Sequence, residues 1–487
     1  MQIDIGKTAS GKIVSLPLAR ANRHGLVTGS TGGGKTVTLQ RLAEEFSRAG
    51  VPVFAADVKG DLSGVAALGC HESSLATRAV AMAGKFTPDR FPVQLWDIFG
   101  THGTRIRTSV QAIGPGLLAR MLKLNQTQEG ALEICFRKSE DDRDWMLTLD
   151  DLRWSLNDMM DNREDICRQY GNITSASIAS IQRQLLSLES QGGDKLFGEP
   201  PFNITDFMRV DDSGRGVINL LHADTLMECP KLYAVFLLWL LTELFRVLPE
   251  AGDVEKPKLV FFFDEAHLLF SDAPKELVQH IERLVRLVRS KGVGVYFVTQ
   301  SPADIPDTVL AQLGSRIQHA LRAYTPKDQR MVKAAAQAFR ENHEVDVRKE
   351  ITALAVGEAL ISVLDDTGVP TKVEKVEILP PSAQVAPISQ IERDAVMAST
   401  PLLARYADVE NSEEAIWRFR DRMREARGLA RPALETNEPW VPGSYAQFVP
   451  DFAPRAAPGP GRGYYLRRLL FWMGVTASGI GVLAALT

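Results

Sequence analysis

The sequence has few cysteines, little excess charge and no apolar leader. Its four cysteines are widely spaced among 487 residues, and no two of them form a C-x-x-C pair. This spacing argues against a zinc ribbon and against a disulfide framework, and it fits a reducing cytoplasm. The first seven residues lack the apolar region of a secretory signal.

The charge balance excludes one simple class of nucleic-acid-binding protein. With a formal net charge of −4, the protein lacks the overall basic surface expected of a protein that coats nucleic acid. Any contact with DNA must therefore come from local loops or from an oligomeric channel. Hydrophobic residues make up 45% of the chain and charged residues 24%, which predicts a globular protein with a sizeable core. At roughly 150 residues per domain the length allows two to four domain-sized units.

The stretch from residue 25 to residue 46 has the pattern of a strand, a phosphate-binding loop and a helix. The short apolar run Gly25–Thr28 precedes eight residues that fit G-x-x-x-x-G-K-[ST] at every fixed position. Such glycines let backbone N–H groups point inward at phosphate oxygens, and the start of the helix adds its unpaired N–H groups. The expected ATP-binding residues are Gly29, Ser30, Thr31, Gly32, Gly33, Gly34, Lys35, Thr36 and Val37.

Two residues of this loop carry specific chemistry. Lys35 is expected to bridge the β- and γ-phosphates of ATP, which makes it a catalytic candidate as well as a binding residue. The hydroxyl of Thr36 is expected to coordinate Mg²⁺. The preceding residues Arg23 and His24 are expected to lie mainly in solvent, because charged and polar residues usually stay exposed; the alternative is that they touch the nucleotide.

A second motif lies at the end of a run of apolar residues, Leu259–Phe263. The run predicts a strand buried on both faces, and it is followed by Asp264 and Glu265. In a sheet of parallel strands these acids fall beside the phosphate loop, where Asp264 is a candidate metal ligand. Glu265 is the candidate general base that orients and polarises the attacking water.

Two further strand ends carry candidate residues. Asp57 follows the apolar strand 51–56, and it either supports the metal site or caps a loop. Gln300 follows the strand 294–299, where it either senses the γ-phosphate and the attacking water or bonds to the backbone.

Arginines near a strand expected over residues 317–323 are candidates for a finger that reaches a neighbouring subunit's nucleotide. They are Arg316, Arg322 and Arg330, and their spacing does not choose among them; we take Arg322 as the working candidate. The amphipathic helix expected over residues 274–291 carries Arg283, Arg286 and Arg289, which form either a solvated face or a patch for nucleic acid or another subunit.

Four of these stretches together resemble the HerA/FtsK class of P-loop motor ATPases, and more closely the bacterial HerA-like helicase-domain proteins. They are the loop at residues 29–36, Asp-Val-Lys-Gly-Asp at 57–61, Phe-Phe-Asp-Glu-Ala-His at 262–267 and Val-Thr-Gln at 298–300. The resemblance implies an α/β, RecA-like P-loop ATPase core with a mostly parallel sheet. It also implies ATP and Mg²⁺ as cofactors, a hexameric ring as the homo-oligomer, and translocation on DNA.

The pattern of composition divides the chain into segments. We expect the ATPase core over residues 1–380, with an all-helical insertion at about 114–208, and a closing hairpin over 354–363 and 368–373. A helical extension is expected over 381–436 and a Pro/Gly-rich linker over 437–463.

The last segment, 464–487, is expected to be an apolar terminal helix, because its final 19 residues carry no charged side chain. It either anchors a cytoplasmic ATPase to the membrane or packs against the core or a neighbouring copy.

The sequence thus predicts an ATP-hydrolysing motor of the HerA/FtsK type that translocates on or remodels DNA. The alternative is an ATP-dependent switch or scaffold that acts on a protein partner, with the membrane as one place for it to act.

Overall fold

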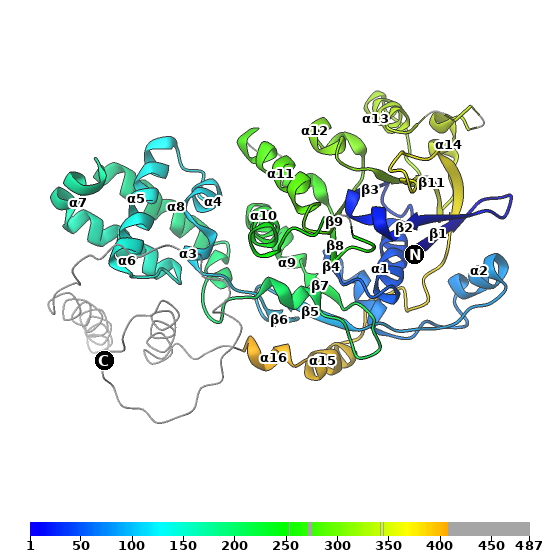
Figure 1. The fold of residues 1–487 in the computed structure, drawn as a ribbon, viewed down its shortest axis with the longest axis horizontal. Coiled ribbons are helices and arrows are strands. Elements are labelled where there is room, and N and C mark those ends of the chain that lie inside the picture. Colours follow the sequence, from blue (N-terminus) through cyan, green and yellow to red (C-terminus); the bar gives the residue numbers. More distant parts are fainter. Residues whose placement is uncertain (253, 271–274, 341, 344, 408–487) are drawn as a thin grey trace, which may run out of the picture.

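The structure is a computed structural model, and it describes residues 1–252, 254–270, 275–340, 342–343 and 345–407. Its centre is a 12-stranded sheet with the order β2-β1-β12-β11-β10-β3-β9-β8-β4-β7-β5-β6 (Figure 1). The strands are β1 (Gln2–Lys7), β2 (Ile13–Pro17), β3 (Gly25–Thr28), β4 (Val53–Asp57), β5 (Val93–Asp97), β6 (Thr104–Arg105), β7 (Ile218–His222), β8 (Leu259–Phe263), β9 (Val293–Thr299), β10 (Ser315–Gln318), β11 (Glu358–Ser362) and β12 (Glu374–Ile378).

From β10 to β6 every neighbouring pair of strands is parallel. The remaining strands, β2, β1, β12 and β11, are antiparallel to one another, and β11 is antiparallel to β10. The carboxyl ends of the parallel strands therefore meet at one edge, which is where open α/β sheets place their ligands. The predicted α/β class with a mostly parallel sheet is confirmed.

Helices cover both faces of the sheet and fill the long connections. They are α1 (Lys35–Arg48), α2 (Ser74–Ala83), α3 (Val110–Ile113), α4 (Pro115–Met121), α5 (Gln126–Asp142), α6 (Leu149–Asp161), α7 (Arg163–Tyr170), α8 (Ser175–Glu189), α9 (Asp224–Met227), α10 (Pro230–Val247), α11 (Lys275–Val288), α12 (Asp307–Leu310), α13 (Pro326–Gln337), α14 (Val347–Ala353), α15 (Gln390–Ser399) and α16 (Leu402–Arg405).

Alternation of side chains along the central strands sends large aromatic residues to both faces. Phe262 in β8 lies on the face covered by α1 and makes ring contacts with Phe46 and Tyr296. Its neighbours Phe261 and Phe263 lie on the opposite face, in the cluster that includes α10 and α11. This is why the run that precedes the acids is apolar without interruption.

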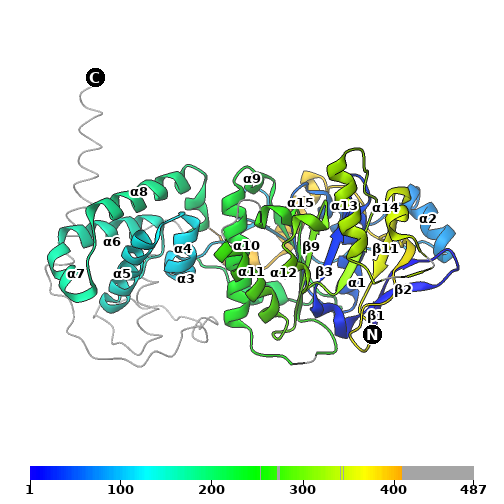
Figure 2. The ribbon, with the colours of Figure 1, turned by 90° about the horizontal axis from the view of Figure 1, so that it is seen from above.

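The helices α3 to α8 form a body beside the sheet, joined to it by the segments after β6 and before β7 (Figures 1 and 2). Of the sheet-covering helices, α10 contacts this body through α4. Capping boxes at Asn125 and Thr148 begin α5 and α6. The helical spacing of leucines and isoleucines in this region therefore corresponds to α-helices packed on one another.

Two strands differ from the sequence expectation. The strand expected over 317–323 is β10, which ends at Gln318 because the next residues turn to the phosphate loop. The second strand of the closing hairpin lies at 374–378 and not at 368–373. The reason is a turn, in which Asp365 N–H donates to Val369 O at 2.9 Å and Pro370 has no N–H to give to a strand.

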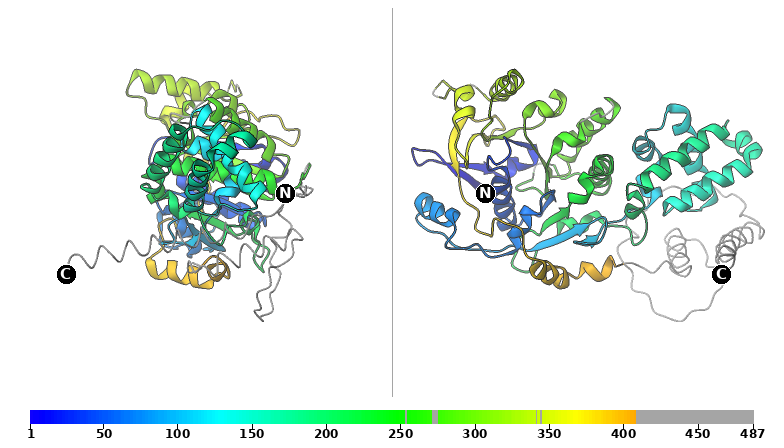
Figure 3. Two further views of the ribbon diagram at one scale, coloured as in Figure 1. Left: turned by 90° about the vertical axis from the view of Figure 1, so that its left-hand side faces the viewer. Right: turned by 180° about the vertical axis from the view of Figure 1, so that it is seen from behind.

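The chain that leaves β12 remains attached to the core. Residues 379–388, which we call the strap, run over the carboxyl-terminal half of α1. They lead to α15, which packs on β5 (Figures 1 and 3). The buried carboxylate of Glu44 accepts hydrogen bonds from Ser382 and from Ala383 N–H, and Gln40 donates to Gln384 O at 3.0 Å.

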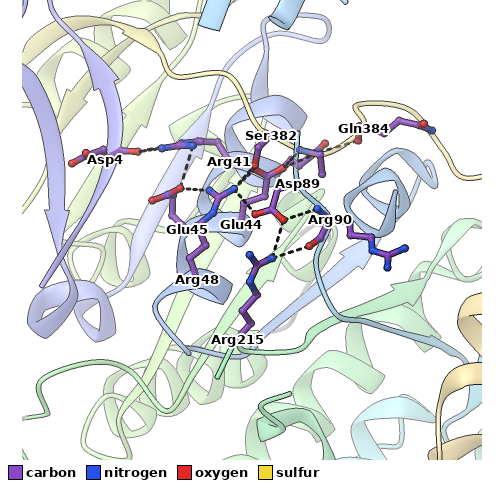
Figure 4. A network of polar contacts seen from close by, with 12 residues as sticks. Asp4, Arg41, Glu44, Glu45, Arg48, Asp89, Arg90, Arg215, Ser382 and Gln384 are labelled. Carbon is purple, nitrogen blue, oxygen red and sulfur yellow. Dashed lines mark hydrogen bonds and ion pairs between the residues drawn. The ribbon is translucent and has the colours of Figure 1, made fainter. Parts of the chain in front are cut away.

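Charged side chains surround this junction (Figure 4). Arg48 contacts Glu45, Asp89 and Ser382, and Arg215 contacts Asp89 at 3.0 Å. Cations and carboxylates alternate through the network, so each neutralises its neighbour. The network fixes the carboxyl end of α1 relative to the strap.

In the part of the chain that the structure describes, no helix is both long and apolar enough to cross a membrane. The apolar helix α10 instead buries its leucines in the core. The predicted helix over 464–487, the linker over 437–463 and residues 408–436 of the predicted extension lie outside the described residues.

Candidate active site

The predicted phosphate loop lies between β3 and α1, as its sequence requires. Gly34 has φ +105° and immediately precedes the first residue of α1, Lys35. Gly29 has φ +153°, and a Cβ added to it would lie 2.5 Å from Cβ of His319. Gly29 is therefore glycine for two reasons, its backbone conformation and the close approach of β10.

Lys35 folds back across the loop. Its Nζ donates to Gly29 O at 2.6 Å and to Ser30 O at 3.2 Å. Burial lowers the pKa of this amine, while the nearby carboxylates of Asp264 and Glu265 oppose that shift. The loop thus brings a partly buried cation close to the two acids after β8.

Asp264 is held by its backbone and by its surroundings. Its Oδ1 accepts from Glu265 N–H at 2.9 Å, and its carbonyl oxygen accepts from the hydroxyl of Tyr233 on α10 at 2.9 Å. Burial, and then the charge of Glu265, raise the pKa of Asp264 to about 6. A buried carboxyl of this kind is stabilised by a nearby cation, which is the electrostatic condition of a metal ligand.

Glu265 has an uncommon backbone conformation. Its φ is +48°, in the left-handed region that side-chain-bearing residues adopt infrequently. Its buried Oε2 lies 3.2 Å from Nδ1 of His267, without hydrogen-bond geometry. Strained residues of this kind cluster where a side chain must be aimed, so the observed outlier favours a functional role for Glu265.

Asp57 ends β4, the strand next to β8, and its side chain is buried. Burial, and then the charges of Asp61 and Asp264, raise the pKa of Asp57 to about 7. The structure therefore brings Asp264 close enough to help raise the pKa of Asp57.

The residues present fit a magnesium ion that is also held by phosphate oxygens. Across the described residues, no three His, Cys, Asp or Glu side chains form a cluster that could hold a metal by themselves. Mg²⁺ bound with nucleotide needs only one or two carboxylates or hydroxyls from the protein. Thr36 in the first turn of α1, with Asp264 and Asp57, supplies oxygen ligands of this type.

Gln300 follows β9, which lies between β3 and β8 in the sheet. Its exposed side chain therefore starts between the phosphate loop and the acids, at the same edge. The neighbouring Thr299 donates its hydroxyl to Asp304 at 2.7 Å, which fixes the turn after the strand.

The candidate arginines separate into two groups. Arg316 donates to the carbonyl oxygens of Ala338 and Leu310, so its guanidinium serves the fold. Arg322 and Arg330 are exposed, and each makes one contact with a backbone carbonyl at 3.4 Å. The side chains of Arg283 and Arg286 on α11 and of Arg289 just after it are exposed, and Arg286 pairs with Glu282.

Sequence reasoning misplaced one residue beside the loop and overlooked others. His24 is 2% exposed and lies at the start of β3, where its Nδ1 accepts from Val295 N–H at 3.1 Å, so the expectation of a solvated side chain is wrong. His319, Ala320 and Tyr233 contact the loop or Asp264 and were not identified. No pattern in the sequence marks His319, because it falls inside the strand expected over residues 317–323.

A family profile decides the relationship of this chain to known proteins. The family described as "Helicase HerA-like C-terminal" matches residues 2–445. The chain belongs to this family. The resemblance of the motifs to HerA-type proteins is therefore confirmed, and with it the RecA-like P-loop core.

Curated relatives of this HerA-like chain include archaeal helicases. A probable helicase of Methanocaldococcus jannaschii is 34% identical over 118 residues, which are 24% of this chain and 22% of that protein. The DNA double-strand break repair helicase HerA of Saccharolobus solfataricus is 24% identical over 184 residues, or 36% of this chain and 33% of that protein. The matched part of the HerA-like chain thus spans a fifth to a third of these relatives.

Solved structures agree on the fold. The bacterial conjugative coupling protein TrwB, in an unbound form, matches with a TM-score of 0.51 and 16% identity over 79% of this chain and 90% of that chain. TrwB in complex with the non-hydrolysable ATP analogue ADPNP matches with a TM-score of 0.52 and 15% identity, over 76% and 88%. At these identities the likeness is one of fold.

Proposed function

We propose that this HerA-like protein is a Mg²⁺-dependent ATPase that couples hydrolysis to movement along DNA or to its remodelling. The observation that carries the proposal is the meeting of Lys35 with Asp264 and Glu265 at the carboxyl edge of the sheet. A phosphate-binding loop and a pair of acids, one of them in a strained conformation, are the parts that phosphoryl transfer needs.

Binding of the nucleotide is assigned to the loop residues 29–36 and to Val37. The ammonium of Lys35 leaves the carbonyl oxygens of Gly29 and Ser30 and moves to the β- and γ-phosphates, which are stronger acceptors. The backbone N–H groups at the start of α1 then face the same anion. TrwB, which shares the fold, is described in complexes with ADPNP and with ADP and Mg²⁺.

Thr36, Asp264 and Asp57 are the residues assigned to Mg²⁺. When bound, the ion neutralises negative charge on the β- and γ-phosphates. The raised pKa values of Asp57 and Asp264 are consistent with carboxyl groups that await a cation.

Glu265 is assigned the role of general base. It follows directly after Asp264, so its carboxylate accepts a proton from water placed beside the γ-phosphate. The exposed amide of Gln300, which starts between the loop and the acids, orients that water or the γ-phosphate. Arg322 from a neighbouring subunit stabilises the charge that develops on the transferring phosphoryl group.

The proposed assembly is a hexameric ring with DNA in its centre. Support comes from family membership and from one relative, which is a DNA double-strand break repair helicase. The acidic net charge then requires that basic side chains gather at the channel, since the overall surface is not basic.

The test is steady-state ATP hydrolysis with and without single- and double-stranded DNA. Lys35→Ala removes the phosphate contact, and Glu265→Gln keeps the shape of the base but not its proton affinity. Glu164→Gln, on the exposed side of α7, makes the same chemical change far from the loop and serves as the control.

We expect DNA to stimulate hydrolysis, and we expect both site variants, but not the control, to abolish it. Suppose that both site variants lose hydrolysis but that DNA does not stimulate the wild type. This outcome would contradict the proposed motor function. That result would favour an ATP-dependent switch on a protein partner. Hydrolysis that survives in Lys35→Ala would contradict the site itself.

A further inference from the structure

A buried histidine joins three elements beneath the phosphate loop. His319, the first residue after β10, is not exposed to solvent. Its Nε2 lies 3.0 Å from the hydroxyl of Thr38 on α1, and its Nδ1 lies 3.0 Å from the carbonyl oxygen of Glu358 at the start of β11. Its backbone N–H donates to Thr28 O, the last carbonyl of β3, at 2.7 Å.

These contacts fix the proton of the ring. A carbonyl oxygen can only accept, so Nδ1 of His319 carries the hydrogen that is donated to Glu358. Burial lowers the pKa of His319 to about 4, so the ring is neutral near pH 7 and Nε2 has no hydrogen. Nε2 therefore accepts from the Thr38 hydroxyl, and each ring nitrogen has one partner.

The same residue forms the surface on which the loop lies. Each of three loop glycines has a Cβ position within 4 Å of His319, at 2.5 Å for Gly29, 3.5 Å for Gly33 and 3.7 Å for Gly34. The next residue, Ala320, accepts two hydrogen bonds from Ser30 through its carbonyl oxygen, from N–H and from Oγ, both at 2.9 Å. The phosphate loop is thus held by two consecutive residues, His319 and Ala320, which directly follow β10.

We propose that His319 is a positioning residue for nucleotide binding, which sets the position of the phosphate loop relative to helix α1 through Thr38. This rests on the proposed function of the loop as the ATP site. Thr38 lies in the first turn of α1, two residues after the assigned magnesium ligand Thr36. The Thr38 bond joins the first turn of α1 to His319, while Ser30 stays bonded to Ala320. When the Thr38 bond is lost, the N–H groups of that turn converge less well on the phosphates.

Loss of the Thr38–His319 hydrogen bond should weaken binding of the ground state and of the transition state alike. The reason is that the same N–H groups hold the phosphates throughout the reaction. The Kd of ADP–Mg²⁺ and the KM of ATP should rise together, while kcat stays nearly constant. For one neutral hydrogen bond in a buried site we expect a rise of about 5-fold.

The experiment removes this bond from either side. In His319→Asn the side-chain amide still donates to Glu358 but does not reach Thr38, and Thr38→Val removes the hydroxyl without changing the shape. Each variant and the double variant are measured for ADP–Mg²⁺ binding by titration calorimetry and for ATP hydrolysis. If the bond is the cause, the double variant binds no more weakly than either single variant. Thr38→Ser keeps a hydroxyl and should bind ADP more tightly than Thr38→Val.

His24 supplies the matched control. It is also a buried histidine with a pKa lowered to about 4 and a hydrogen bond to a backbone group, but it lies at the other end of β3. His24→Asn should lower stability without changing the Kd of ADP. If His24→Asn weakens ADP as much as His319→Asn, or if Thr38→Val binds ADP like the wild type, the positioning role is wrong. Wild-type protein that binds no nucleotide would contradict the proposed function as well.

Discussion

The buried carboxylate of Glu44 accepts two hydrogen bonds from Ser382, one from the backbone N–H and one from the hydroxyl, both at 2.7 Å. The two residues are 338 positions apart in the chain. Glu44 lies on the helix that begins at the phosphate loop, and Ser382 lies on the strap. A charge with no exposure is thus stabilised by donors that come from the end of the described core (Figure 4).

Glu44→Gln should therefore destabilise the fold strongly. The substituted amide would direct N–H groups at donors of the strap, which leaves buried groups unpaired at a cost of about 2–4 kcal/mol. Urea unfolding followed by circular dichroism measures this loss. Glu45→Gln, on the next residue, changes only partly exposed ion pairs with Arg41 and Arg48 and should cost less than about 1 kcal/mol. Equal losses for the two variants would contradict the role of Glu44.

The contribution of His24 to the stability of the fold should fall as the pH drops from about 6.5 toward 4. Burial lowers the pKa of His24 to about 4, so in this range the unfolded chain binds a proton that the folded chain does not. The His24 contribution therefore rises with pH across this window, by up to about 3 kcal/mol, whereas the raised pKa values of Asp57 and Asp264 act in the opposite direction. His24→Asn should make the free energy of unfolding rise less with pH between 4 and 6.5. An unchanged slope would mean that His24 is protonated in the folded protein.

Two glycines of the loop should respond differently to alanine. At Gly29 a Cβ would lie 2.5 Å from Cβ of His319, whereas at Gly32 nothing lies within 4 Å. Gly32→Ala should therefore lower the free energy of unfolding by only about 1 kcal/mol, because alanine is strained in the left-handed backbone conformation. Gly29→Ala adds a steric overlap with β10 and should cost at least about 2 kcal/mol. Thermal unfolding gives both values, and the idea fails if Gly32→Ala is the more damaging change.

The parts of the site that lie in one contiguous motif could be predicted from the sequence. The loop at 29–36 and the acids after β8 follow from local rules, because a glycine-rich turn and a buried strand each have a clear pattern. The placement of Asp57 beside Asp264 needed only the rule that parallel strands end at one edge.

The contacts that hold the loop depend on which strands become neighbours, and spacing along the chain does not contain this information. His319 reaches the loop because β10 lies next to β3 in the sheet, although 290 residues separate Ser30 from Ala320. For the same reason the end of β10 was placed too late in the sequence. The closing strand was placed too early, because Val369 and Pro370 have an apolar pattern but form a turn.

The arginine that acts between subunits can be identified by mixing two inactive variants. Arg322 is exposed, whereas Arg316 is used by the fold, so Arg322→Ala should abolish hydrolysis and leave stability nearly unchanged. Lys35→Ala is inactive because its own loop is damaged. In a ring that contains both variants, some interfaces join an intact loop to an intact arginine, about a quarter of them at equal amounts. Mixing should therefore restore about a quarter of the wild-type rate.

Mixing Arg330→Ala with Lys35→Ala tests the other exposed candidate. Arg316→Ala is expected to be less stable than the wild type, and mixing it with Lys35→Ala should not restore hydrolysis. Rescue of Arg330→Ala but not of Arg322→Ala would assign the role to the residue on α13. If neither variant is rescued, although each is inactive alone, the arginine acts on the nucleotide of its own subunit. Because a monomer cannot supply an intact interface from two damaged chains, rescue also demonstrates that the active form is an oligomer.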